Sequence, residues 1–191
     1  MSSRPSLTRR SLGAFLGMPF ALADAHSADL WSALRSPDHL ALIRHAVAPG
    51  TLDPPDWRLD DCATQRNLSA EGRRQATGMG GLFRANGITA ARIHSSQWCR
   101  CLDTAMLLKL GEVTPQPLLN SFAEDRSRSS QQTDALRTWI GQQALDQPIL
   151  LVTHQVVISA LTSAFAGNGE IVVVRREADG RLSLQGRQPT G

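Results

Sequence analysis

Short apolar runs alternate with amphipathic segments along most of the chain. A short apolar run bounded by polar or turn residues is typical of a buried strand, and apolar residues at helical spacing are typical of a helix packed against a sheet. The apolar runs predict strands over residues 39–44, 91–94, 113–118 and 148–153. The amphipathic segments predict helices over residues 29–34, 69–86, 98–110, 133–143 and 156–165.

The pattern continues to the C-terminal end with two further strands, 170–175 and 181–184. They flank Asp179-Gly180, a dipeptide that favours a tight hairpin turn. Gly78-Met79-Gly80-Gly81 lies inside a predicted helix and not between a strand and a helix, so it indicates close helix packing and not a nucleotide loop. Alternating strands and helices predict an α/β fold: a three-layer α/β/α sandwich with a mostly parallel sheet.

The N-terminal 25 residues have the pattern of an export signal. Arg9-Arg10 precede an apolar run that is too short to span a bilayer, and small residues follow it. The paired arginines are similar to a twin-arginine signal. An ordinary amphipathic N-terminal helix is the alternative. We expect a signal peptide over 1–25, cleaved after Ala23 or Ala25, and a single periplasmic or secreted domain over 26–191 without a stable membrane span.

Charge gives no reason to expect a nucleic-acid partner. The formal charge is +3, but residues 1–25 carry Arg4, Arg9, Arg10 and Asp24, so the remaining chain has a net charge of only +1. Hydrophobic residues make up 41% of the chain, which is enough for a packed core.

Three predicted strands end in polar residues with suitable chemistry. Arg44-His45 follows the first strand, Ser95-Ser96 the second, and His154 the strand over 148–153. Side chains at the carboxyl ends of parallel strands meet at one edge of the sheet. Arg100 lies in the first turn of the helix after Ser95-Ser96, where backbone N–H groups also attract anions. A guanidinium binds two phosphate oxygens at once, and a neutral imidazole can attack phosphorus, so the sequence predicts a phosphate site.

Four segments in this order resemble the histidine phosphatase (phosphoglycerate mutase-like) superfamily. Leu42-Ile43-Arg44-His45-Ala46 is similar to the Arg-His-Gly signature of that family. Residues 66–76 are similar to its Leu, hydroxyl and Gly helix start, and residues 95–105 to its Ser-Ser-x-x-x-Arg-x-x-x-Thr-Ala segment. Residues 150–154 are similar to its late strand and second histidine. The resemblance covers about residues 39–175.

The resemblance implies a role for each matching residue. His45 would attack the phosphoryl group and form a phosphohistidine, which water then hydrolyses. Arg44, Arg100 and His154 would bind the phosphoryl oxygens, because negative charge spreads over them in the transition state. The family takes its proton donor from a loop after the third strand. Here that loop holds Glu124-Asp125, and we favour Asp125 with Glu124 close behind it.

The same resemblance implies a phosphatase. We expect no cofactor and no metal, because no two histidines have metal-ligand spacing and Cys99-x-Cys101 lacks a second pair. Ala46 stands where the family usually has glycine, and Gln155 follows the second histidine where glycine is frequent. The chain lacks the insertions of the mutases, so we expect a phosphomonoester hydrolase acting on a small phosphorylated substrate, such as a cell-envelope sugar phosphate. The alternatives are a phosphohistidine or phosphoprotein phosphatase, and a catalytically dead phosphate-binding module.

The chain has three cysteines, Cys62, Cys99 and Cys101. In an oxidising compartment Cys62 can pair with either of the other two. We hypothesise a Cys62–Cys101 disulfide, which would attach the loop after the first strand to the helix that carries Arg100.

Overall fold

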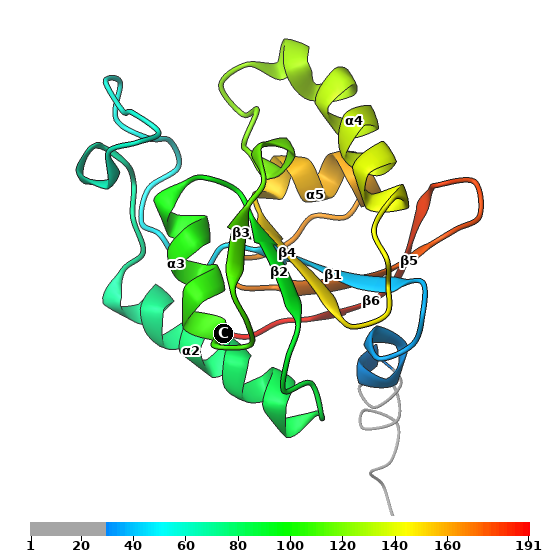
Figure 1. Cartoon of the computed structure of the whole chain (residues 1–191). Coiled ribbons are helices and arrows are strands. Elements are labelled where there is room, and N and C mark those ends of the chain that lie inside the picture. Colours follow the sequence, from blue (N-terminus) through cyan, green and yellow to red (C-terminus); the bar gives the residue numbers. More distant parts are fainter. Residues whose placement is uncertain (1–29) are drawn as a thin grey trace, which may run out of the picture.

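A computed structural model describes residues 30–191 (Figure 1), so the predicted signal peptide lies outside the described residues. A six-stranded sheet in the order β3-β2-β4-β1-β5-β6 forms the centre of the molecule. The four strands from β3 to β1 run parallel, and β5 and β6 are antiparallel additions at one edge. The strands are β1 (His39–Arg44), β2 (Arg92–Ser95), β3 (Val113–Pro115), β4 (Ile149–Thr153), β5 (Ile171–Arg176) and β6 (Leu182–Gln188).

Helices cover both faces of this sheet, which confirms the predicted three-layer architecture (Figure 1). The helices α2 (Ala70–Ala85) and α3 (Cys99–Leu108) pack together on one face, and α4 (Ser129–Gly141) and α5 (Gln155–Thr162) lie on the other. Three short 3₁₀ helices, η1 (Cys62–Thr64), η2 (Pro117–Leu119) and η3 (Arg126–Arg128), lie in the connections. Residues 30–34 are also helical.

Several predicted boundaries move for local reasons. The predicted strand over 113–118 ends at Pro115, because Pro117 begins η2. The predicted helix over 156–165 ends at Thr162, where Ser163 adopts a left-handed conformation with φ of 61°. The predicted helix over 133–143 begins earlier, at Ser129, as a continuation of η3.

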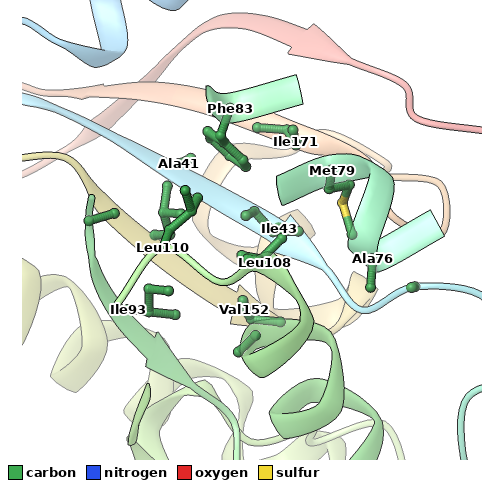
Figure 2. Packing of buried hydrophobic residues seen from close by; sticks show 14 of the residues in the cluster. Ala41, Ile43, Ala76, Met79, Phe83, Ile93, Leu108, Leu110, Val152 and Ile171 are labelled. Carbon is green, nitrogen blue, oxygen red and sulfur yellow. The ribbon is translucent and has the colours of Figure 1, made fainter. Parts of the chain in front are cut away.

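The core on the α2–α3 face holds alternate residues of the central strands. Ile43 of β1 and Val152 of β4 point into it and meet Phe83 and Met79 of α2 (Figure 2). The two helices approach closely at Gly80, because a Cβ atom there would lie 2.1 Å from the Leu108 carbonyl oxygen. This contact confirms close helix packing for Gly80, whereas a Cβ atom at Gly78 or Gly81 would meet nothing within 4 Å.

Strand register brings the polar strand ends together. In the parallel β1–β4 pair Arg44 is opposite Thr153, and the His45 N–H donates to the Thr153 carbonyl at 3.0 Å. In the β2–β4 pair the Ser96 N–H donates to the Val152 carbonyl at 2.9 Å. His45, Ser96 and His154 therefore leave the sheet side by side at its carboxyl edge. No helix within residues 30–191 is long and apolar enough to cross a membrane.

Candidate active site

A pocket of about 240 Å³ opens beyond the carboxyl ends of β1 and β4. Six of the residues that line it were predicted as site residues, namely Arg44, His45, Arg100, Glu124, Asp125 and His154. The structure thus places the sequence-predicted set at one location. The pocket also holds Asp53 and Arg66 from the loop after β1, together with the aromatic residues Trp57, Trp98 and Phe122.

His45 has the tautomer that an attacking imidazole needs. Its Nδ1 lies 2.8 Å from the Ala46 carbonyl oxygen, which can only accept, so Nδ1 carries the proton. Nε2 is therefore the basic nitrogen, and it has no hydrogen-bond partner among the described residues. Burial, and next the charge of Arg100, lower the pKa of His45 to about 3. The imidazole is consequently neutral at physiological pH.

His154 lies beside His45, with the two ring centroids 5.5 Å apart. The Nε2 atom of His154 is 2.8 Å from Ser96 Oγ and 3.5 Å from Cys101 Sγ. Burial lowers the pKa of His154 well below its ordinary value, and repulsion from a protonated His45 and from Arg100 adds to the effect. Two neutral histidines thus lie next to positively charged side chains. The electrostatic environment of the pocket therefore favours binding of an anion.

Three arginines supply those positive charges. Arg44 donates from Nη1 to the Ala166 carbonyl at 2.9 Å, and Arg66 donates from Nη1 to the Ala48 carbonyl at 2.6 Å. The Nε atoms of Arg44, Arg66 and Arg100 are all buried without a hydrogen-bond partner. Burial, together with the neighbouring charge of Arg100, lowers the pKa of both Arg44 and Arg66. Three guanidinium groups line one pocket, and the excess of positive charge that they give it favours an anionic ligand.

Asp53 is the negative charge that faces these arginines. Its carboxylate accepts from Arg100 Nη1 at 2.8 Å and Nη2 at 3.2 Å, and from the Trp98 indole N–H at 3.0 Å. The side chains of Asp53 and Arg100 are 5% and 4% exposed. Burial opposes ionisation, but hydrogen bonds from the Arg66 backbone N–H and from Arg100 outweigh it and lower the pKa of Asp53. The ion pair fixes the orientation of the Arg100 guanidinium through Nη1 and Nη2, and Nε takes no part in it.

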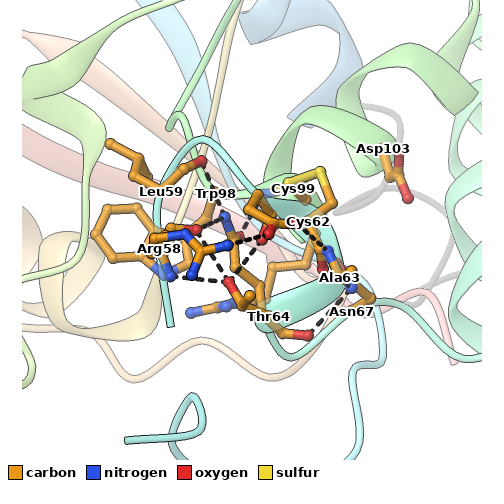
Figure 3. The surroundings of a disulfide bond; sticks show 12 residues. Arg58, Leu59, Cys62, Ala63, Thr64, Asn67, Trp98, Cys99 and Asp103 are labelled. Carbon is orange, nitrogen blue, oxygen red and sulfur yellow. Dashed lines mark hydrogen bonds and ion pairs between the residues drawn. A yellow bond between two sulfur atoms is a disulfide. The ribbon is translucent and has the colours of Figure 1, made fainter. Parts of the chain in front are cut away.

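The loop after β1 is attached to α3 by a disulfide between Cys62 and Cys99 (Figure 3). The hypothesised Cys62–Cys101 pair is therefore wrong. Residues two apart on a helix point about 200° away from each other, so Cys99 and Cys101 face opposite sides of α3. Cys101 is buried against the Thr153 carbonyl and His154, where burial raises the pKa of its thiol to about 12.

Two carboxylates stand at the mouth of the pocket. Glu124 Oε2 accepts from the Trp57 indole N–H at 3.0 Å, and Trp57 packs on Trp98 with ring centroids 4.7 Å apart. Asp125 caps η3, because its Oδ1 accepts from the Ser127 backbone N–H at 3.2 Å. Trp57 therefore holds Glu124 at the pocket, whereas the side chain of Asp125 is turned to the helix start.

This chain matches several solved structures of the same architecture over nearly the whole length of each of them. The protein histidine phosphatase SixA bound to tungstate is 14% identical, with a TM-score of 0.59 over 80% of this chain and 97% of that one. A mutant phosphoserine phosphatase from Entamoeba histolytica, bound to phosphoserine, is 17% identical, with a TM-score of 0.58 over 80% and 97%. A putative SixA phosphohistidine phosphatase from Agrobacterium tumefaciens is 19% identical, with a TM-score of 0.58 over 82% and 100%.

The chain has the histidine phosphatase fold. No protein-family model matches the sequence, and no curated protein matches it. Its likeness to that fold therefore stands on the structure and on the four sequence motifs together.

Within the histidine phosphatase fold, this chain has site residues that the sequence did not reveal. Thr104 Oγ1 accepts from the Ala46 N–H at 3.0 Å and donates to the Arg100 carbonyl at 2.7 Å, so it joins the segment after β1 to the first turn of α3. Its place in the Thr-Ala end of the motif was the available signal. Asp53 gave no signal, because it lies in an irregular loop. Arg66 precedes the α2 helix start, where a charge can be either solvated or turned to the site; it is half-buried and lines the pocket.

Proposed function

We propose that this protein is an exported phosphatase that hydrolyses phosphomonoesters through a phosphohistidine on His45. The observation that carries the proposal is the contact between His45 Nδ1 and the Ala46 carbonyl, which leaves a neutral Nε2 facing a pocket lined by three arginines. A nucleophilic nitrogen and an excess of guanidinium donors are the two requirements of phosphoryl transfer to histidine.

The first step forms a bond between His45 Nε2 and phosphorus and breaks the bond between phosphorus and the ester oxygen. Arg44, Arg100 and His154 bind the phosphoryl oxygens, and Arg66 adds a third guanidinium. Their charge stabilises the transition state more than the ground state, because negative charge shifts toward the oxygens that they face. In the second step water attacks phosphorus, and the bond to His45 breaks to release inorganic phosphate.

A carboxyl group must give a proton to the leaving oxygen and later take one from water. We assign this role to Glu124 in preference to Asp125. The Trp57 indole N–H holds Glu124 Oε2 at the pocket mouth, which leaves Oε1 available to carry the proton. The carboxylate of Asp125 already accepts hydrogen bonds from Ser127, as the N-cap of η3.

Export to the periplasm or beyond the cell is part of the proposal. The twin-arginine pattern in residues 1–25 supports it, and so does the Cys62–Cys99 disulfide, since disulfides persist in oxidising compartments. Substrates of such an enzyme would include phosphorylated sugars of the cell envelope.

A phosphohistidine or phosphoprotein phosphatase is the second candidate function. Structural neighbours described as phosphohistidine phosphatases favour it. The pocket of this chain is small and walled by Trp57, Trp98 and Phe122, which suits a small ester better than a histidine on a folded protein. Intact His45 and arginines argue against the third alternative, a catalytically dead phosphate-binding module.

The deciding experiment traps the phosphoenzyme. We expect wild-type protein mixed with a ³²P-labelled ester and quenched in alkaline detergent to retain label that acid releases, because phosphohistidine is acid-labile and base-stable. His45→Ala should retain none, and His39→Ala, at the opposite end of β1, should retain as much as wild type. Equal phosphate release by wild type and His45→Ala would refute the nucleophile.

A further inference from the structure

A second hollow adjoins the phosphate pocket on the α5 side. Phe122, Gln155 and Val156 line both hollows, so the two adjoin. Beyond these shared residues the second hollow is lined by Ser159 and Ala160 of α5, by Ser129 of α4 and by Phe165 in the loop that follows α5. Four of its eight lining residues, Phe122, Val156, Ala160 and Phe165, are apolar, and they define a groove that begins beside the phosphate pocket. The exposed Arg126 lies at its edge.

Phe165 is an exposed aromatic residue in this groove. Among the described residues four large apolar side chains are exposed, and two of them, Phe165 at 67% and Leu52 at 64%, line the two joined hollows. Leu52 lies at the phosphate pocket and Phe165 at the second hollow, so each of the two adjoining hollows has one exposed apolar side chain at its margin, available to an apolar ligand.

The backbone that carries Phe165 is fixed to the phosphate site. The Ala166 N–H donates to Gln155 Oε1 at 2.7 Å, and the Ala166 carbonyl accepts from Arg44 Nη1 at 2.9 Å. Arg187 donates to the Phe165 carbonyl from the other side. The backbone at Phe165 and Ala166 is therefore held by hydrogen bonds, one of them from the pocket residue Arg44, and this fixes the point at which the exposed ring is attached.

We propose that the groove binds the apolar portion of an amphiphilic phosphomonoester, in which a hydrocarbon chain is attached close to the phosphate. The inference rests on the proposed function and names its substrate class. In-line transfer places the leaving oxygen on the side of phosphorus opposite His45, so the leaving group extends toward the mouth of the pocket. From there Phe122 and Val156 lead the chain toward Phe165. The arginine cluster binds the anionic head, and the groove removes the tail from water.

A series of n-alkyl phosphates, used below their critical micelle concentrations, tests this substrate class. We expect kcat/KM to rise roughly tenfold from butyl to octyl phosphate, because an open groove recovers about half of the transfer free energy of each methylene. Phe165→Ser should reduce that rise to less than threefold. Met106→Ser is the matched control: Met106 is 54% exposed on α3 and lines neither hollow.

Binding of n-alkyl phosphonates, measured by calorimetry, separates the two proposals. Affinity that rises with chain length and depends on Phe165 supports the groove, even if no ester is hydrolysed and the proposed phosphatase function fails. If neither kcat/KM nor affinity changes with chain length, the groove does not bind the apolar portion and this proposal is wrong. Hydrolysis of every ester at the same rate would still support the proposed phosphatase function.

Discussion

Asp53 and Arg100 form a buried, two-point ion pair in which Nη1–Oδ1 and Nη2–Oδ2 are 2.8 and 3.2 Å apart. Asp53 belongs to the loop after β1 and Arg100 to the first turn of α3, so the pair joins segments 47 residues apart in the chain. Both outer nitrogens of the guanidinium are occupied by the carboxylate, while the buried Nε has no partner. Asp53 therefore fixes the orientation of the Arg100 guanidinium at the pocket, and the proposed function needs that orientation.

The first prediction concerns this pair. Asp53→Ala should lower the free energy of unfolding by about 3 kcal/mol, because it leaves Arg100 as an unpaired buried charge. It should also lower kcat/KM at least tenfold and weaken inhibition by vanadate, since Arg100 loses its orientation. Urea unfolding and vanadate titration measure the two effects.

Asp134→Ala is the control for that experiment. Asp134 pairs with Arg137 at 3.3 Å on the exposed side of α4, and its side chain is 69% exposed. Surface pairs of this kind contribute about 0–1 kcal/mol, so stability and vanadate inhibition should be nearly unchanged. If vanadate inhibits Asp53→Ala as tightly as it inhibits wild type, Asp53 does not position Arg100.

The sequence predicts the sheet and the strand ends well because burial dictates both. Strands β1 and β4 are buried on both faces, so their residues form continuous apolar runs that end where the polar site begins. Because β1 and β4 are parallel neighbours, the residues that follow them, His45 and His154, lie side by side. These two histidines, with Arg44 and Arg100, could therefore be placed at one site before any coordinates.

The loop between β1 and α2 could not be predicted in the same way. Its path follows specific contacts and not a periodic pattern: the disulfide from Cys62, Asp53 on Arg100, and Gln65 Oε1 accepting from the Cys99 N–H at 3.0 Å. The choice between Cys99 and Cys101 depended on the rotational phase of α3. Sequence spacing alone does not fix which of two close helical residues faces a loop.

The second prediction is a loss of stability in mild acid. The pKa of His45 is about 3 in the folded protein and near 6.5 when unfolded, so between these values the unfolded state binds the additional proton. Stability should therefore fall as the pH drops from about 6.5 toward 3, by up to about 1.4 kcal/mol per pH unit for this group. The pKa of His154 is also lowered in the folded protein, so this residue likewise reduces stability as the pH falls.

Urea unfolding of wild type and His45→Ala at pH 6, 5 and 4 checks the histidine contribution. The variant should lose less stability over this range, whereas His39→Ala should follow wild type. The contribution of Asp53 is separable, because its lowered pKa means that its stabilisation is lost only at more acidic pH. Parallel curves for wild type and His45→Ala would show that His45 titrates normally.

The third prediction concerns the thiols. Cys101 is fully buried with a pKa raised to about 12, and Cys62 and Cys99 are joined. Without reductant, folded protein should react with no iodoacetamide, unfolded protein with one equivalent, and reduced unfolded protein with three. Peptide mapping should place the single label on Cys101. A label on Cys99 would instead support the Cys62–Cys101 pair.

Removal of the disulfide should also be measurable as stability. The bond closes a loop with a sequence separation of 37, which corresponds to about 3–4 kcal/mol in the chain-entropy model. The double variant Cys62→Ser/Cys99→Ser should unfold at a correspondingly lower urea concentration, while Cys101→Ser keeps the cross-link.

The fourth prediction identifies the proton donor. A general acid matters most when the leaving oxygen is a poor leaving group, because that oxygen must be protonated as the bond to phosphorus breaks. Glu124→Gln should therefore slow hydrolysis of an alkyl phosphate about 10²-fold or more, but p-nitrophenyl phosphate much less. Trp57→Phe removes the indole donor to Glu124 Oε2 and should produce the same selective loss in weaker form. Asp125→Asn keeps most of the N-cap geometry at η3 and should slow both esters equally little. Should Asp125→Asn produce the leaving-group dependence and Glu124→Gln not, the proton comes from Asp125.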